Sequence, residues 1–326
     1  MLNIFLPFLA ACALVFTGCK TTQRQQESPA ADVNFETANQ YAQDGLYREA
    51  MASYQKVLTR DPNNFTAHRN LGMVLVKVGH YKKATQHLEK SLAQYNENYE
   101  ANFYLAESYR AREKYADAIF RYKKSLEAKP NDQKTLKALS WSYYKIRYYT
   151  EALRIIKELK GSADEGNEIA IITARILLKI NRPEKALAVI HKAEALAKKS
   201  ELPYLQSVEG DIQRATGDMD KAVEAYTEAL KSQPLLAGAL LGLGQALLPK
   251  DKKNQEKALS YMERAIRVKP RYPEALYALG KAYESIDADK SMKYYKMFRK
   301  IANADPEFLD EMYVVKSRLD MKAVGN

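Results

Sequence analysis

The sequence predicts an all-α protein, and more specifically an elongated α-solenoid of paired helices. Gly (13) and Pro (11) are scarce among 326 residues, and 46% of the residues are apolar, a balance that suits helices. The chain is longer than one compact core usually holds. A pattern of small and aromatic residues also recurs every 34 residues. A fixed period of this length is typical of a repeat array.

The period is clearest in a series of small residues, each of which we place on the second helix of a pair. The first four follow a Tyr by three positions, and the series reads Ala50, Ala84, Ala118, Ala152, Ala186, Ala222, Ala258 and Ser291. A matching series on the first helices reads Ala38, Gly72, Ala106, Ser140, Ala174, Gly210, Gly244 and Gly280. We expect these positions to lie where helices cross closely, because larger side chains would force the backbones apart.

Larger residues complete each unit. Four positions after each second-helix small residue stand Tyr54, Leu88, Tyr122, Ile156, Ile190, Tyr226, Met262 and Tyr295. We expect them in the core, and Pro62, Pro130, Pro234 and Pro270 to close repeats because Pro disrupts a continuing helix. Residues 161–167 are predicted to form a joint, and the segment 186–199 is longer than its counterparts and precedes a two-residue insertion.

The pattern resembles the tetratricopeptide repeat, W-x₂-L-G-x₂-Y…A-x₃-F…P over 34 residues. The pairs Leu71-Gly72, Leu243-Gly244 and Leu279-Gly280 reproduce its Leu-Gly, whereas its Trp is absent. The resemblance covers about residues 31–305 in eight units, and it implies that the first helices line a concave groove for partner peptides. It does not extend to the clamp by which some members of the family bind the two carboxylates at the C-terminus of a chaperone. That clamp needs cations at the positions where Phe35, Glu100 and Tyr104 stand.

The predicted organisation has four parts. A signal peptide occupies residues 1–18, a lipidated Cys and flexible tether residues 19–33, the repeat array residues 34–305, and a capping helix with its tail residues 306–326. The capping helix is predicted because a last repeat leaves an uncovered apolar face. Its apolar residues have helical spacing: Phe308, Leu309, Met312, Val315 and Leu319.

The first eighteen residues carry no charged side chain and are followed by a polar segment, which is the form of a secretory signal. Residues 16–19, ending in Cys19, resemble the lipobox of bacterial lipoproteins. The resemblance implies acylation of Cys19 and attachment to a membrane, because several acyl chains anchor firmly. Cys12 ends a second candidate motif that leaves a shorter signal. An ordinary cleaved signal or an uncleaved anchor is the remaining alternative.

No catalytic, metal-binding or cofactor-binding motif is evident. The four His residues are His68, His80, His87 and His191, and none has metalloprotease spacing. We therefore predict no enzymatic activity, no metal and no cofactor.

The net charge of +11 is concentrated in residues 65–202, which carry +10. Export argues against nucleic acid as the partner of this basic region. An anionic envelope polymer, peptidoglycan or lipopolysaccharide, is one alternative, and ordinary Lys-rich helix surfaces explain the charge equally well.

Groove residues are predicted at first-helix positions between the packing positions. Aromatic and Arg side chains there suit peptide binding, and the predicted set is Arg69, Asn70, Met73, Phe103, Glu107, Arg110, Lys137, Trp141, Tyr144 and Arg175. Tyr104, Lys134 and Ile171 lie beside them. Trp141 is the only Trp, and its alternative role is packing against a neighbouring first helix.

These features together predict a noncatalytic adaptor in the bacterial envelope, on the outer membrane and facing the periplasm. The layout is similar to that of pilotin lipoproteins of type IV pili and of lipoproteins that dock cell-wall hydrolases. It implies protein partners, with a membrane contact through Cys19.

Overall fold

The computed structural model describes residues 29–159, 167–248, 252–302 and 305–324, which form helices and, within those ranges, no strand. Eight helix pairs follow one another. Their first helices are α1 (Pro29–Gln43), α3 (Phe65–Lys77), α5 (Tyr99–Ala111), α7 (Gln133–Lys145), α9 (Asn167–Lys179), α11 (Leu202–Thr216), α13 (Ala237–Leu247) and α15 (Pro273–Tyr283). Their second helices are α2 (Tyr47–Arg60), α4 (Tyr81–Gln94), α6 (Tyr115–Ala128), α8 (Tyr149–Leu159), α10 (Pro183–Glu194), α12 (Met219–Ser232), α14 (Lys252–Val268) and α16 (Ala288–Ala302).

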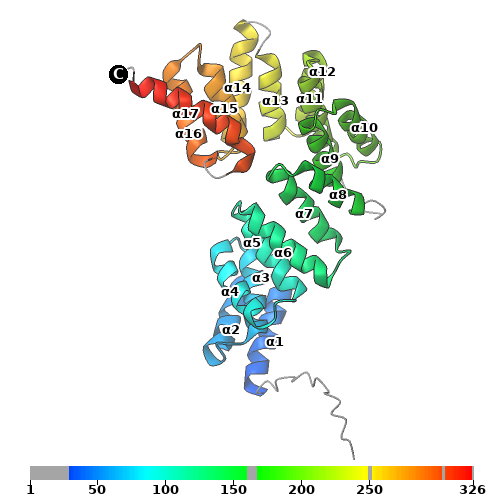
Figure 1. The fold of residues 1–326 in the computed structure, drawn as a ribbon, viewed down its shortest axis with the longest axis vertical. Helices are drawn as coiled ribbons and strands as arrows, with labels where there is room; N and C mark the ends of the chain where they lie inside the picture. Colours follow the sequence, from blue (N-terminus) through cyan, green and yellow to red (C-terminus); the bar gives the residue numbers. More distant parts are fainter. Residues whose placement is uncertain (1–28, 160–166, 249–251, 303–304, 325–326) are drawn as a thin grey trace, which may run out of the picture.

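The pairs stack in chain order along a curved array, from α1 at one end to α16 at the other (Figure 1). A 3-10 helix, η1 (Pro306–Phe308), and a last helix, α17 (Leu309–Val324), complete it. The predicted all-α solenoid of about eight pairs with a C-terminal helix is therefore confirmed. Residues 1–28, including Cys19, lie outside the described residues. Helix α1 begins at Pro29, so the last part of the predicted tether is helical.

The predicted packing positions form the core. All eight larger second-helix residues are at most 2% exposed, and all eight small residues beside them are buried. Tyr226 shows how the units interlock. A Cβ on Gly210 would lie 2.6 Å from the Tyr226 ring, and one on Gly242 of the next pair would overlap that ring. The aromatic ring therefore fills the space between α11 and α13, and glycine on both helices permits their approach.

Two further periodic features position the helices. Residues with positive φ recur in the turn inside each of the first six pairs, namely Gly45, Gly79, Glu113, Arg147, Asn181 and Gly217. The first helices α3, α5 and α7 begin with side-chain caps, in which Asn64, Asn98 and Asp132 accept a hydrogen bond from a backbone N–H three residues on. Each cap satisfies an amide that the helix itself leaves unpaired.

The C-terminal segment covers the last pair. Phe308 and Val315 are buried, and the Phe308 ring packs edge-on against Phe298 of α16 at 5.8 Å between centroids. The prediction was wrong for Leu309, which is 62% exposed. Residues 306–308 form a separate 3-10 turn, so Leu309 is the first residue of α17 and lies about 120° around the helix from Val315. Among the described residues, no helix combines the length and apolar character needed to cross a bilayer.

Candidate protein-binding groove

Three successive first helices, α5, α7 and α9, line a hollow of about 400 Å³. Its lining residues are Phe103, Glu107, Arg110, Lys134, Lys137, Ala138, Trp141, Glu168, Ile171 and Ile172. Five of the ten predicted groove residues are therefore brought together around one site. The array's fold does this because residues 34 positions apart occupy equivalent places on adjacent first helices.

The floor of the hollow is aromatic and aliphatic. Phe103 is only 3% exposed and packs against Tyr104 and Tyr122, at 5.3 and 6.0 Å between ring centroids. It was predicted as a groove residue, but most of its ring belongs to the core. Trp141 is half-buried, with its ring 5.3 Å from that of Tyr144. Trp141 packs against the buried core cluster and also lines the hollow.

Four of the five charged groups of the hollow are paired with one another. Arg110 binds Glu107 at 2.6 Å, and the Tyr122 hydroxyl donates a hydrogen bond to the same carboxylate. The hydrogen bond with Glu107 raises the pKa of Arg110, although burial opposes the shift. Lys137 lies 3.5 Å from Glu168. These pairs leave an apolar depression with a polar rim.

Lys134 differs from the other cations of the hollow. Its Nζ lies 4.5 Å from the Phe103 ring centroid and 5.6 Å from that of Tyr104, and it has no ion pair among the described residues. A cation over aromatic faces is stabilised by the ring quadrupoles. With Lys134, Lys137 and Arg110 against Glu107 and Glu168, the hollow carries one excess positive charge.

The predicted groove residues of α3 lie outside this hollow, and two of them, Arg69 and Asn70, bind each other. Asn70 donates a hydrogen bond to Asn39 at 2.9 Å and accepts one from Arg69 at 3.0 Å. Arg69 also lies 3.5 Å from Glu100. The Tyr54 hydroxyl donates to Asn39 at 2.6 Å. This network joins the first two repeats to the third. Met73, on the same helix, is half-buried.

Tyr144 and Arg175 also lie outside the hollow. Tyr144 is buried, and its hydroxyl donates a hydrogen bond to Glu307 at 3.4 Å. The C-terminal segment therefore occupies the space into which Tyr144 was predicted to point. Arg175, on α9, is half-buried. The sequence-based set omitted Ala138, Glu168 and Ile172. Ala138 and Glu168 stand three positions before Trp141 and Ile171, and Ile172 stands four after Glu168, so helical spacing places them around the same depression.

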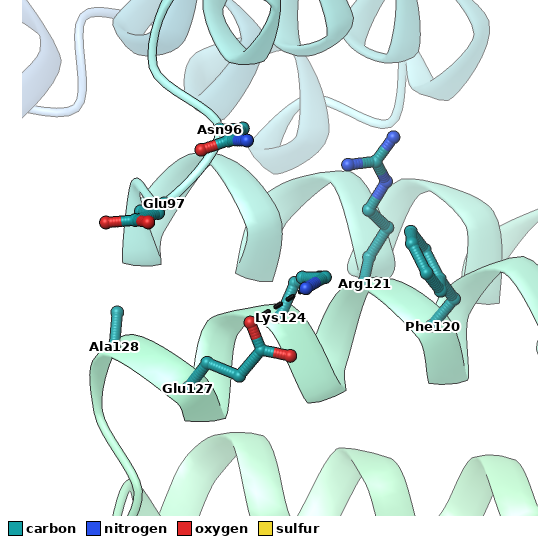
Figure 2. Close-up of a pocket in the computed structure, with 7 residues that line it drawn as sticks. All are labelled: Asn96, Glu97, Phe120, Arg121, Lys124, Glu127 and Ala128. Atoms are coloured by element: carbon teal, nitrogen blue, oxygen red, sulfur yellow. Dashed lines mark hydrogen bonds and ion pairs between the residues drawn. The ribbon is translucent and has the colours of Figure 1, made fainter.

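A second hollow, of about 460 Å³, lies between α6 and the segment before α5. Figure 2 shows Phe120, Arg121 and Lys124 projecting from α6 on the side of Asn96 and Glu97. Lys124 binds Glu127 at 2.8 Å. Arg121 and Lys124 are matched in number by Glu97 and Glu127, so the charges of this hollow balance. None of the predicted groove residues lines it, and Phe120 is its one large apolar side chain.

Stacked helix pairs that line a hollow with their first helices define the class of α-solenoid repeat proteins. The chain is a tetratricopeptide repeat protein. Models of the tetratricopeptide repeat match residues 38–79, 75–140 and 208–256. A model of subunit 3 of the anaphase-promoting complex, or cyclosome, matches residues 111–193.

Solved structures share the architecture. A tetratricopeptide repeat protein from Parabacteroides merdae is 13% identical, with a TM-score of 0.66 over 83% of this chain and 99% of that one. Yeast Tom70 is 17% identical, with a TM-score of 0.59 over 93% of this chain and 67% of that one. At these identities the likeness concerns the fold alone.

Among curated proteins, the BBSome complex member BBS4 homolog of Drosophila melanogaster is 23% identical over 221 residues. The match covers 64% of this chain and 45% of that protein. The chain therefore spans less than half the length of this relative.

Proposed function

We propose that the protein is a noncatalytic scaffold, anchored to a membrane of the bacterial cell envelope, that holds a segment of a partner protein in the hollow around Trp141. The fold supports a protein-binding role, because stacked repeats create extended concave surfaces. The observation that carries the proposal is the convergence of α5, α7 and α9 on one apolar depression beside Trp141 and Arg110.

The chemistry of the hollow suits one apolar side chain of a bound segment. Trp141 and Ile171 offer accessible apolar surface, and half-buried Trp and Arg side chains are frequent hot spots of protein binding. The volume of about 400 Å³ is within the range of specific binding pockets. Because Lys134 adds positive charge at the edge, a carboxylate beside the apolar side chain would add to the affinity.

Photocrosslinking tests the proposed site. A photoreactive amino acid at position 141 should capture a discrete partner in cells. The matched control is position 120 on α6, where Phe120 is 54% exposed but lies outside the hollow. Capture of the same partner with equal yield from both positions would count against the hollow as the binding site.

The membrane anchor is a separate part of the proposal. It rests on the apolar residues 1–18 and on the position of Cys19 at the start of the polar segment. Outer-membrane attachment facing the periplasm is what the lipobox resemblance implies, because Lys20 and not Asp follows Cys19. Cys19→Ser should move the protein from the membrane to the soluble fraction, and its retention in the membrane would refute lipidation at Cys19.

The second candidate function is binding of an anionic envelope polymer, which the charge of +10 over residues 65–202 favours. Salt separates the two functions, since the Debye length falls to about 3 Å at 1 M ionic strength. Polymer binding should be lost at high salt, whereas capture by an apolar hollow should persist.

A further inference from the structure

The junction between the fifth and sixth repeats brings together three side chains that can ligate a metal. His191 and Glu194 belong to the last turn of α10, and their i,i+3 spacing places them on one helix face. Glu209 comes from α11. One ligand atom from each residue lies within 4.8 Å of the other two. The sequence spacing alone predicted no metal motif, because the third residue becomes adjacent only when α11 packs beside α10.

One distance within this trio fits a bound ion. The His191 Nε2 and Glu209 Oε1 atoms are 3.3 Å apart. Two ligands that each lie 2.0–2.1 Å from one tetrahedral zinc ion are separated by about 3.3 Å. This distance also suits a hydrogen bond, so the case depends on the third residue.

Glu194 provides the independent observation. Its Oε1 is buried and accepts no hydrogen bond, and the residue has no ion pair within the described ranges. A buried carboxylate oxygen without a partner is costly. The neighbouring Glu209 is also acidic, and within the described ranges its only ion-pair partner is His191. A divalent cation bound among the three residues would offset the two adjacent carboxylates.

We propose that His191, Glu194 and Glu209 bind a zinc ion, with water completing the coordination. An imidazole together with carboxylates suits zinc, whereas magnesium and calcium prefer all-oxygen ligands. The ion would join α10 to α11 across residues 195–201, which overlap the segment 186–199 that the sequence marks as longer than its counterparts. It would thereby stabilise the junction between the fifth and sixth repeats.

Calorimetric titration of the untagged full chain with zinc chloride at pH 7 tests the proposal. We expect one zinc ion per chain, and no binding of magnesium or calcium chloride. His191→Ala and Glu209→Gln should each weaken zinc binding by about tenfold or more, because each removes one ligand. His80→Ala is the matched control and should bind as the unaltered protein does, since His80 is exposed before α4.

A second comparison keeps the outcome decisive. The paired imidazoles of His68 and His87 are the competing ligand set in the described residues, so His87→Gln should retain zinc binding. Loss of binding in that variant would overturn the assignment. Failure to bind zinc at about 1 mM, or unaltered affinity in the double variant His191→Ala/Glu209→Gln, would do the same. Circular dichroism verifies that each variant is folded.

Discussion

The Lys145 ammonium group of α7 lies 3.2 Å from the Asp305 carboxylate and also binds Glu307. Lys145 and Glu307 are 162 positions apart in the chain, and all three side chains are less than 15% exposed. Burial lowers the pKa of Lys145, but the carboxylates raise it more, so the ammonium form is favoured. The segment that follows α16 therefore packs back against the fourth repeat through a buried ionic contact.

Removal of this cation should loosen the C-terminal segment. Lys145→Met leaves two buried carboxylates without their partner, and breaking such a pair costs about 3–5 kcal/mol. We expect faster hydrogen exchange in α17 and a lower urea midpoint. Arg147→Met is the matched control, because its pair with Asp310 is exposed and contributes about 0–1 kcal/mol. Equal effects of the two substitutions would contradict the buried contact.

The imidazoles of His68 and His87 should make stability depend on pH. The His68 Nε2 donates to the Pro62 carbonyl at 3.0 Å, so its Nδ1 accepts a hydrogen bond from His87 Nδ1 at 2.8 Å. Burial lowers the pKa of both, that of His87 to about 4. His68 and then Lys90 lower the pKa of His87 further. The hydrogen bond to Pro62 raises the pKa of His68, Lys90 lowers it and Asp61 raises it.

The sign of the pH effect follows from linkage. Between pH of about 4 and 6.5 the unfolded chain binds more protons than the folded one, so stability falls as the pH is lowered through this range. His87→Gln should flatten that part of the curve of unfolding free energy against pH. Identical slopes in the variant and the unaltered protein would show that the pair does not titrate in this way.

The positive φ in the turns inside the first six pairs leads us to expect opposite effects of two substitutions. Gly79 has φ of 80°, and a Cβ there would meet no atom within 4 Å. Gly79→Ala should therefore lower the unfolding free energy by about 1 kcal/mol through backbone strain alone. Glu113 has φ of 59° at the equivalent place, so Glu113→Gly should raise it. Chemical denaturation measures both, and destabilisation by Glu113→Gly would contradict the prediction.

Two glycines of α13 separate helix packing from helix propensity. A methyl group at Gly242 would overlap the Tyr226 ring, whereas one at Gly238 would lie 3.5 Å from its nearest neighbour, the Ser207 hydroxyl. Gly242→Ala should cost about 1–3 kcal/mol through overpacking. Gly238→Ala should be neutral or stabilising, because Ala favours a helix over Gly by about 1 kcal/mol. Thermal unfolding distinguishes them, and similar losses in both would refute close crossing at Gly242.

The sequence predicted the repeat units because their packing is local. Each unit repeats the same small and large residues, and every larger second-helix residue, such as Tyr226, is in the core. The positive-φ turns and the Asn64, Asn98 and Asp132 caps share the period. The turns were missed because Glu113, Arg147 and Asn181 replace the expected glycine in three of the six.

The candidate site was less predictable because it depends on how the array curves. Helical spacing placed Trp141 and Tyr144 on the same face of one helix. It could not show that the Tyr144 hydroxyl binds Glu307 of the C-terminal segment. It likewise left open the orientation of Phe103, since Phe103 and Tyr104 differ by about 100° around the helix. Contacts between α7 and η1, or between His191 and Glu209, require the folded array.

The affinity of the captured partner for the Trp141→Ala protein tests the proposed function most directly. Tyr148→Ala is the control, because Tyr148 is 61% exposed and does not line the hollow. We predict that Trp141→Ala weakens binding by 2 kcal/mol or more, about 30-fold, as expected of a hot spot, with the melting curve nearly unchanged. Unchanged affinity would show that the partner binds elsewhere, and a collapsed fold would show that Trp141 serves only the core.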